Sequence, residues 1–377
     1  MSFFYRIIFI SLFLYLSLSA EEKATTEKTI PKIVIEEKEI AEITKSYTST
    51  QSNFGGISES GNLLSTIPGI NIGRMGGHGL EPVIQGQQQG QLNVQEQGAF
   101  IFGGCPNRMD TPSSISNVNI YDLIETSLGY QSVTNGPGAS GGTINFVRST
   151  PEKGTKGILK SEYISNGDIS NSLADISYNN EQEFVRFTGS YNDAGNYKDG
   201  NGKTVRSAFS QASGILDFGY EKSESEKIKV SILSTEINDA LFAGAGMDSP
   251  YTRVFAPKIM ASLPVANQQL DFLLYSSFVD HAMDNYSLRP NNTSMLARVS
   301  SDSDTYGGKI ASTYKTDKFT HQFGFDTQII ERSAKRFVGP QKDQVGVFQS
   351  YLWPNLKSEN YGLFMETDYD ITEDKGL

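Results

Sequence analysis

Apolar and polar residues alternate along most of the chain after residue 152. In the run 319–329, one set of alternate positions is apolar or aromatic with few exceptions, and the other set is polar or glycine. Successive side chains of a β-strand point to opposite faces, so each such run predicts a strand with one apolar face. Turn-forming clusters such as 199–202 separate the runs. The region 153–377 is long enough for about ten such strands with their loops.

Residues 51–152 have a different, glycine-punctuated pattern that predicts a compact mixed domain. A short helix is expected at 62–67, where Pro68 and Gly69 stop it, and a strand follows at 70–72. Three further elements are expected in this domain: a strand at 118–120, a helical turn at 122–126 and a strand at 143–147.

The first twenty residues have the pattern of an export signal. Arg6 precedes a short apolar stretch at 7–18, so a signal peptide is expected over residues 1–20. An N-terminal membrane anchor is the less favoured alternative, because the stretch is too short to cross a bilayer as a helix. Residues 21–50 are mostly charged and polar, which predicts a flexible segment. Within it, the β-branched run 32–36 is suited to pair with the sheet edge of a partner.

Composition narrows the class of protein. The formal net charge of −11 argues against nucleic acid as a partner, because phosphate binding needs clustered Lys and Arg. The chain combines 36 glycines and 11% aromatic residues with a mildly polar mean hydropathy of −0.35. An exported β-barrel has this combination because its alternating faces average out, although a soluble antiparallel sheet also alternates. Cys105 is the one cysteine, so it is either a free thiol or a chemically active group.

Two stretches of the mixed domain resemble motifs of TonB-dependent receptors. Residues 63–72 resemble the opening of the plug domain of these receptors, and 135–146 resemble its closing motif. The run 32–36 lies where such receptors carry the TonB box. The expected TonB-coupling residues are therefore Ile33, Val34 and Ile35. The resemblance implies a mixed α/β plug domain at 51–152, followed by a partial transmembrane antiparallel β-barrel at 153–377.

By the same resemblance, the protein is expected in the outer membrane of a Gram-negative bacterium. Its implied partners are the outer-membrane lipids and TonB of the energising complex in the inner membrane. Ten strands are about half of what such a barrel should need, and unpaired strand edges are costly in lipid. The chain is therefore expected to be a fragment, the N-terminal part of a longer receptor.

Three further stretches, 103–110, 244–250 and 281–283, resemble the copper-receptor branch of this superfamily. This branch implies energised uptake of copper without an organic cofactor. The residues it implies as metal ligands are Cys105, Met109, His281 and Met283. Thiolate and thioether sulfur are soft donors and imidazole is borderline, so the set suits copper, above all Cu(I).

The spacings by themselves indicate how these residues could meet. Pro106 suits the first position of a helical turn, with Cys105 as N-cap and Met109 one turn on. The N–H groups of that turn, together with Arg108, would favour the thiolate. The alternative is an inert buried cysteine beside a packing methionine.

His281 and Met283 are two residues apart and therefore share one face of the expected strand. This face is the less apolar one, which predicts that both residues point into the lumen. A polar stretch at 284–292 follows and predicts a long external loop, so the pair should lie near the outer mouth. The alternative is an interfacial histidine beside a methionine that only packs.

Other functions stay open at this point. The cargo could be an iron–siderophore, haem or cobalamin, which aromatic and arginine-lined loops bind without a Cys/Met/His set. A passive porin or adhesin is less favoured because its lumen needs no plug. An enzyme is not expected, since no catalytic triad, phosphate-binding loop or paired-carboxylate motif stands out. His78 is expected to be structural, His321 interfacial and Met247 an ordinary loop residue.

Overall fold

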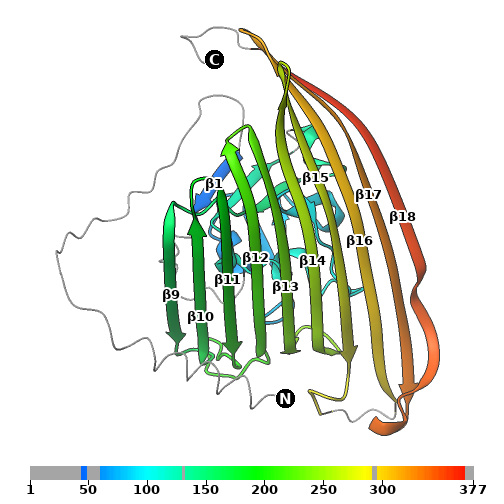
Figure 1. Ribbon diagram of the computed structural model, residues 1–377. Helices are drawn as coiled ribbons and strands as arrows, with labels where there is room; N and C mark the ends of the chain where they lie inside the picture. The colour runs from blue at the N-terminus through cyan, green and yellow to red at the C-terminus, as the bar shows by residue number, and fades with distance from the viewer. Residues whose placement is uncertain (1–43, 49–59, 130–131, 291–294, 370–377) are drawn as a thin grey trace, which may run out of the picture. The chain divides into compact units, whose positions relative to one another are not determined.

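A ten-stranded antiparallel sheet is the largest element of the protein (Figure 1). The computed structural model describes residues 44–48, 60–129, 132–290 and 295–369. Each strand of the sheet pairs with the next one in the chain, and β9 and β18 form its two edges. The strands are β9 (Gly154–Ile164), β10 (Ile169–Asn179), β11 (Glu183–Ala194), β12 (Phe209–Ser223), β13 (Glu226–Ala240), β14 (Asp248–Val265), β15 (Gln268–Asp284), β16 (Leu296–Lys315), β17 (Phe319–Gly339) and β18 (Val347–Tyr369). The predicted number and antiparallel order of strands are confirmed.

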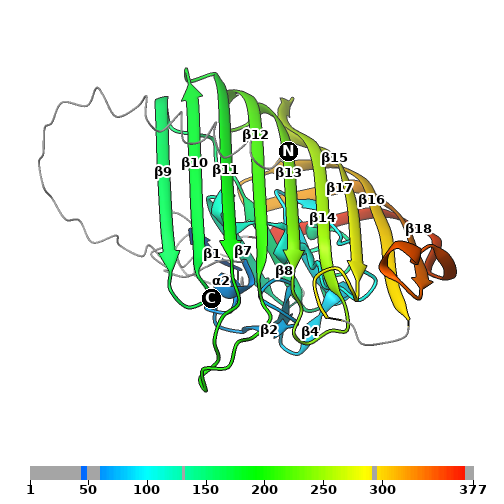
Figure 2. The same cartoon turned by 90° about the horizontal axis from the view of Figure 1, so that it is seen from below.

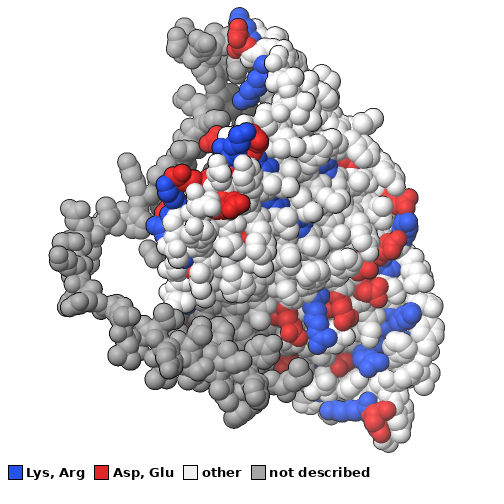
Figure 3. All heavy atoms as spheres, viewed as in Figure 1, with Lys and Arg blue, Asp and Glu red and all other residues white. Residues whose placement is uncertain are grey.

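One face of this sheet is apolar, as the alternation predicts. Phe319, Phe323 and Phe325 of β17 are all exposed on it, and so is Leu274 of β15. Charged side chains are sparse over the middle of this face (Figure 3). The exposed apolar side chains follow from the period of two in the sequence, because the backbone pairs in register along each strand.

The two ends of the sheet differ in the length of their connections. At one end the strands join through the tight turns 180–182, 224–225, 266–267 and 316–318. At the other end β9 and β10 join through the short turn 165–168, and the connections 195–208, 241–247, 285–295 and 340–346 are longer. We call these ends the short-turn edge and the long-loop edge. The long connection after Asp284 agrees with the loop predicted from the polar sequence there.

A mixed domain packs on the other side of the curved sheet (Figures 1 and 2). In the described part of the chain, no helix is apolar and long enough to cross a membrane. One sheet of this domain has the strand order β1-β7-β8-β5-β6 and the other β2-β3-β4. The elements are β1 (Thr44–Thr48), α2 (Ser60–Leu64), β2 (Ile70–Arg74), β3 (Leu80–Ile84), β4 (Gln87–Gln88), η2 (Gln89–Gln91), β5 (Leu92–Glu96), β6 (Ala99–Phe100), α3 (Pro112–Ile115), η3 (Val118–Ile120), β7 (Leu123–Leu128), η4 (Val133–Asn135) and β8 (Gly142–Val147).

Two local predictions in this domain are wrong. Val118–Ile120 is a 3-10 helix, because the Asn117 side chain accepts the N–H of Asn119 and starts a turn. The expected helical turn at 122–126 is instead strand β7, which pairs with both β1 and β8. Tertiary pairing overrides a short local pattern here. The expected strands at 70–72 and 143–147 are confirmed, and the expected helix at 62–67 is present as α2, which begins and ends earlier, at Ser60–Leu64.

A shared apolar core joins the mixed domain to the large sheet. Buried side chains from both parts contact one another in a single cluster. Those of the mixed domain include Leu64, Ile124 and Phe146, and those of the sheet include Ile215 and Leu233. Burial of this apolar area is the main non-directional contribution to their association.

Buried ion pairs reinforce this contact nearer the short-turn edge. Arg148, which follows β8, pairs with Asp217 of β12 at 2.6 Å, and both side chains are almost fully buried. Lys258 of β14 donates to the main-chain oxygen of Glu96 at 2.8 Å, and its Nζ lies 3.7 Å from the Glu96 carboxylate. Each of these buried charges lies beside an opposite charge, and this pairing offsets the free-energy cost of removing both from water.

Candidate metal site

The loop 101–111 of the mixed domain presents Cys105 to the large sheet. The Asp110 carboxylate accepts the N–H groups of Gly104 at 2.7 Å and of Cys105 at 2.8 Å. A Cβ atom on Gly104 would lie 2.8 Å from the Cβ of His281, so only glycine permits this approach to β15. The loop is thus folded around one carboxylate and pressed against one strand.

The expected helical turn after Cys105 is absent from this loop. Arg108 donates its N–H to the Cys105 oxygen at 2.9 Å, which closes a single turn, and Arg108 itself has a φ of 56°. A left-handed residue cannot continue a right-handed helix, so Met109 is placed by the turn and not by helical spacing. The first helical residue nearby is Pro112 of α3.

Cys105 and Met283 meet across the boundary between the mixed domain and the sheet. The Cys105 Sγ lies 3.4 Å from the Met283 Sδ, although the residues are 178 positions apart in the chain. Both side chains are 3% exposed. Two soft sulfur atoms from separate parts of the fold are therefore in contact at a site buried from water.

Met109 belongs to the same buried cluster of apolar side chains as Cys105 and Met283. Its side chain is 5% exposed. The remaining buried members of the cluster are Ala194, Phe209, Ile237, Ala240 and Phe242. This cluster, which we call the sulfur cluster, lies near the long-loop edge and is shielded from water.

His281 is on the same face of β15 as Met283, and both are buried as the strand parity predicts. Its Nδ1 lies 2.7 Å from the Thr252 hydroxyl of β14 and 3.6 Å from the Asp110 carboxylate. Its Nε2 is buried and has no hydrogen-bond partner among the described residues. Such an imidazole nitrogen is an available donor for a metal ion.

The charge state of Cys105 differs from the expectation of a favoured thiolate. Burial raises the pKa of the thiol to about 12, and the charge of Asp110 raises it further, against the backbone N–H groups of Met109, Asn107 and Arg108. Arg108 does not help, because it pairs with Glu81 at 2.8 Å. Without metal the residue is a neutral thiol, so a bound ion has to displace its proton.

His78 is closer to this region than its sequence context suggests. It is buried, and its ring centroid lies 5.2 Å from that of Phe209, a member of the sulfur cluster. Burial, and then the charge of His281, lower the pKa of His78 to about 3, so it stays neutral. A Cβ on Gly79 would lie 2.3 Å from the Met109 oxygen. In the sequence, the glycines on both sides of His78 are the feature that could have indicated this close packing.

The loop 241–247 covers the sulfur cluster from the long-loop edge. Phe242 of this loop is buried in the cluster, and Met247 packs against it from a partly exposed position. Asp248 binds both Arg206 and Arg289. Arg289 also donates to the oxygens of Ala245 at 2.8 Å and Phe242 at 3.2 Å. We call Asp248, Arg206 and Arg289 the clasp.

Sequence reasoning did not single out Asp110, Thr252 or Arg289. Aspartate and arginine are common on loops, and nothing local marks the ones that become buried. His321, expected to be interfacial, is partly exposed on β17, and its Nδ1 lies 2.9 Å from the Thr367 hydroxyl. The TonB-coupling residues Ile33, Val34 and Ile35 and the signal segment 1–20 lie outside the described residues.

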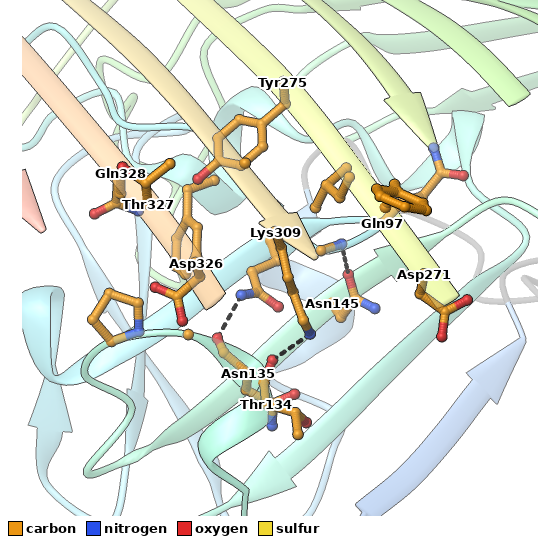
Figure 4. Close-up of a pocket in the computed structure, with 18 residues that line it drawn as sticks. Gln97, Thr134, Asn135, Asn145, Asp271, Tyr275, Lys309, Asp326, Thr327 and Gln328 are labelled. Atoms are coloured by element: carbon orange, nitrogen blue, oxygen red, sulfur yellow. Dashed lines mark hydrogen bonds between the residues drawn. The ribbon is translucent and has the colours of Figure 1, made fainter. Parts of the chain in front are cut away.

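A polar cavity of about 340 Å³ lies between the mixed domain and the sheet, nearer the short-turn edge (Figure 4). Lys309 reaches across it and donates to the Thr134 oxygen at 2.6 Å. Asp271, Asp326 and Gln328 line its sheet side. Its lining includes no thiol, thioether or imidazole, so its donors are all hard. The cavity differs in chemistry from the sulfur cluster at the other edge.

Over the described ranges, no group of three or more His, Cys, Asp or Glu side chains is placed to hold a metal ion. The sulfur cluster with His281 adds methionine sulfur to these donor types, with a thiol, two thioethers and an imidazole in one region.

Comparisons with known proteins agree with this architecture. No protein-family model matches the chain, and no curated protein matches it. Among solved structures, it is similar to the copper transporter OprC, with a TM-score of 0.77 and 27% identity over 88% of this chain and 53% of that one. It is also similar to the ferric citrate transporter FecA in the unliganded form, with a TM-score of 0.66 and 12% identity over 89% of this chain and 55% of that one.

A third similar structure is the pyoverdine outer membrane receptor FpvA from Pseudomonas aeruginosa PAO1 bound to pyoverdine. Its TM-score is 0.62, with 13% identity over 88% of this chain and 55% of that one. The chain thus spans about half the length of each of the three structures. The open antiparallel sheet and these likenesses show that the chain has the fold of the TonB-dependent receptors, which reside in the outer membrane of Gram-negative bacteria.

Proposed function

We propose that the protein is an outer-membrane copper receptor that binds copper through Cys105, Met109, His281 and Met283. The observation that carries the proposal is the 3.4 Å contact between the sulfur atoms of Cys105 and Met283. Copper is then held between the mixed domain, which acts as the plug, and the barrel wall. The likeness to the copper transporter OprC supports the same cargo.

The chemistry of the donors supports copper over iron. A thiol, two thioethers and an imidazole form a soft set, and the surrounding aromatic and aliphatic side chains exclude water. Cu(I) accepts such ligands, whereas Fe(III) prefers the hard oxygen donors of a chelator. The set is enclosed, because each of the four side chains is at most 5% exposed. A bare ion fits this enclosure, but a large organic chelate does not.

Sharing the ligands between plug and barrel offers a way to release the ion. We place the TonB-coupling segment at Ile33, Val34 and Ile35. A pull on the plug through TonB would draw Cys105 and Met109 away from His281 and Met283. Loss of two donors from a four-ligand set weakens the site, and the ion can leave inward.

A ferric siderophore is the second candidate cargo. The likeness to the pyoverdine receptor FpvA supports it at the level of the fold. The polar cavity near the short-turn edge offers hard donors of the kind that a hydrophilic chelate uses. Under this alternative the sulfur cluster is only packing between plug and barrel.

Metal analysis of the purified full-length receptor separates the two candidates. After growth with copper, we expect about one copper per receptor, and loss of most of it in Cys105→Ala and Met283→Leu. Met365→Leu is the matched control, because Met365 is exposed on the outer face of β18. No copper in the unaltered receptor, or equal copper in all variants, would overturn the proposal.

An uptake arm of the same experiment tests the coupling to TonB. A receptor lacking residues 33–35 should bind as much copper as the unaltered receptor and should fail to deliver it to cells. Copper accumulation in a host without its own copper receptor provides the measurement. Uptake at the unaltered rate would contradict the role of this segment.

A further inference from the structure

Asp110 contacts both halves of the proposed metal site. One carboxylate oxygen accepts the Cys105 N–H at 2.8 Å, and the other accepts the Gly104 N–H at 2.7 Å. The second oxygen also lies 3.6 Å from Nδ1 of His281. Asp110 is 2% exposed, so it makes these contacts away from water. One side chain of the plug therefore faces a proposed ligand of the plug and a proposed ligand of the barrel.

The position of this carboxylate bears on which ring nitrogen of His281 carries the proton. A neutral imidazole has one N–H and one lone pair, and only the nitrogen with the lone pair can bind a metal. A carboxylate accepts hydrogen bonds but donates none, so its charge beside Nδ1 favours the tautomer with the proton on Nδ1. The Thr252 hydroxyl, 2.7 Å from the same nitrogen, can accept that proton's hydrogen bond.

The other ring nitrogen has the environment that this tautomer requires. Nε2 of His281 is buried and has no hydrogen-bond partner among the described residues. An Nε2–H in this place would be a buried donor without an acceptor, which is costly. With the proton on Nδ1, the buried Nε2 carries a lone pair that is available to a metal ion.

We propose that Asp110 is the positioning residue of the copper site: with Thr252 it holds His281 in the Nδ1–H tautomer, and through two N–H groups it fixes the Cys105 loop. The inference rests on the proposed copper function, because it assigns a role to a residue beside those ligands. Carboxylates and hydroxyls that orient metal-binding histidines in this way typically change metal affinity ten- to hundredfold.

The test compares Asp110→Asn and Thr252→Val in the full-length receptor. Asparagine places an amide donor where the carboxylate accepts, so it favours the Nε2–H tautomer. Valine keeps the shape of Thr252 but loses the hydroxyl, and it leaves the Cys105 loop untouched. Cu(I) affinity is measured by competition with a chelator under reducing conditions. We expect about a ten- to hundredfold loss in Asp110→Asn and a smaller loss in Thr252→Val. Asp302→Asn, at an exposed site on the outer face of β16, is the control.

Two spectroscopic readouts distinguish positioning from collapse of the loop. X-ray absorption of the copper-loaded Asp110→Asn receptor should show the sulfur ligands retained and the nitrogen ligand lost. Nitrogen-15 NMR of metal-free, histidine-labelled receptor should show the tautomer of His281 shift toward Nε2–H. Loss of sulfur and nitrogen together would mean that Asp110 acts only through the loop, and the proposal would fail.

Different results would overturn the copper function and the role of Asp110. If the unaltered receptor holds no copper, the proposed function is wrong whatever Asp110 does. If the unaltered receptor holds copper and both variants bind it equally well, the copper function stands and the role of Asp110 is overturned. The tautomer measurement needs no metal, so in either case it tests whether Asp110 sets the tautomer of His281.

Discussion

The mixed domain and the large sheet meet in two regions of opposite chemistry. Near the long-loop edge, the contact consists of Cys105, Met109 and Met283 with His281 beside them, and one nitrogen there has no partner among the described residues. Nearer the short-turn edge, it consists of charged pairs such as Arg148 with Asp217. The first region contains neutral, soft groups, and the second contains full charges that satisfy one another.

The difference indicates that the two regions have separate roles. A buried ion pair is costly to separate, because each charge would be left without compensation in a poorly polarisable environment. Neutral sulfur atoms can separate without that penalty, and they gain a strong interaction only when a soft metal is present. The ionic region is therefore suited to hold the mixed domain in place, and the sulfur cluster is suited to respond to a soft metal.

Breaking the ionic region should have the largest effect on stability. Asp217→Ala leaves Arg148 buried without its partner and also removes the acceptor of the Ser231 hydroxyl. We expect the free energy of unfolding to fall by about 3–5 kcal/mol. Denaturant titration of the receptor in detergent, followed by tryptophan fluorescence and circular dichroism, measures it.

The control for this variant is an exposed ion pair of the same sheet. Lys153 and Glu181 pair while both side chains are more than 60% exposed, at 69% and 63%. Glu181→Ala should change the free energy of unfolding by less than about 1 kcal/mol. Equal effects of the two substitutions would show that the buried pair has no special role in holding the mixed domain on the sheet.

The sulfur cluster should respond to pH, in contrast to the ionic region. The pKa of Cys105 is about 12 in the metal-free protein, so copper binding releases the thiol proton at any lower pH. One proton released per ion means that the affinity rises about tenfold per pH unit, or about a hundredfold from pH 6 to 8. Chelator competition at several pH values measures this slope, after correction for the chelator's own protonation.

A methionine variant isolates the thiol in that experiment. Met283→Leu removes a donor that has no proton to lose, so it should weaken binding equally at every pH and keep the slope. Cys105→Ala should abolish the slope along with most of the affinity. A flat profile in the unaltered receptor would show that copper binds without deprotonating Cys105.

The clasp should control the access of reagents to the sulfur cluster. We expect this effect to be smaller than those on stability and on the pH dependence of copper binding. Arg289→Lys keeps the charge near Asp248 but cannot reach the oxygens of Ala245 and Phe242 as the forked guanidinium does. Loss of about 1.4 kcal/mol of loop stability would raise the open fraction about tenfold. Alkylation of Cys105, located by mass spectrometry, should speed up by that factor.

Arg253→Lys is the matched control for the clasp. Arg253 pairs with Glu236 at 3.2 Å on the exposed face of the sheet, away from the loop 241–247. Its substitution should leave the alkylation rate of Cys105 unchanged. An unchanged rate in Arg289→Lys as well would show that the thiol is reached by another route.

Local periodicity was sufficient to predict the large sheet. Alternation along β17 and β15 predicted the strands, the outward direction of Phe319 and Phe325, and the inward direction of His281 and Met283. The mixed domain was predicted less well, because its elements are short. The run Val118–Ile120 has strand-forming residues, yet a hydrogen bond from the Asn119 N–H to the Asn117 side chain starts a 3-10 helix there.

What the sequence determined by itself is the alternation of faces, the order of strands and a set of soft donors at suggestive spacings. Only the tertiary structure decided that Cys105 contacts Met283, that its thiol is protonated, and that Asp110 links the two sides. The physical reason is the range of the interactions. Strand parity depends on neighbours two residues apart, whereas the sulfur contact joins residues 178 positions apart and depends on the packing of a whole domain against the sheet.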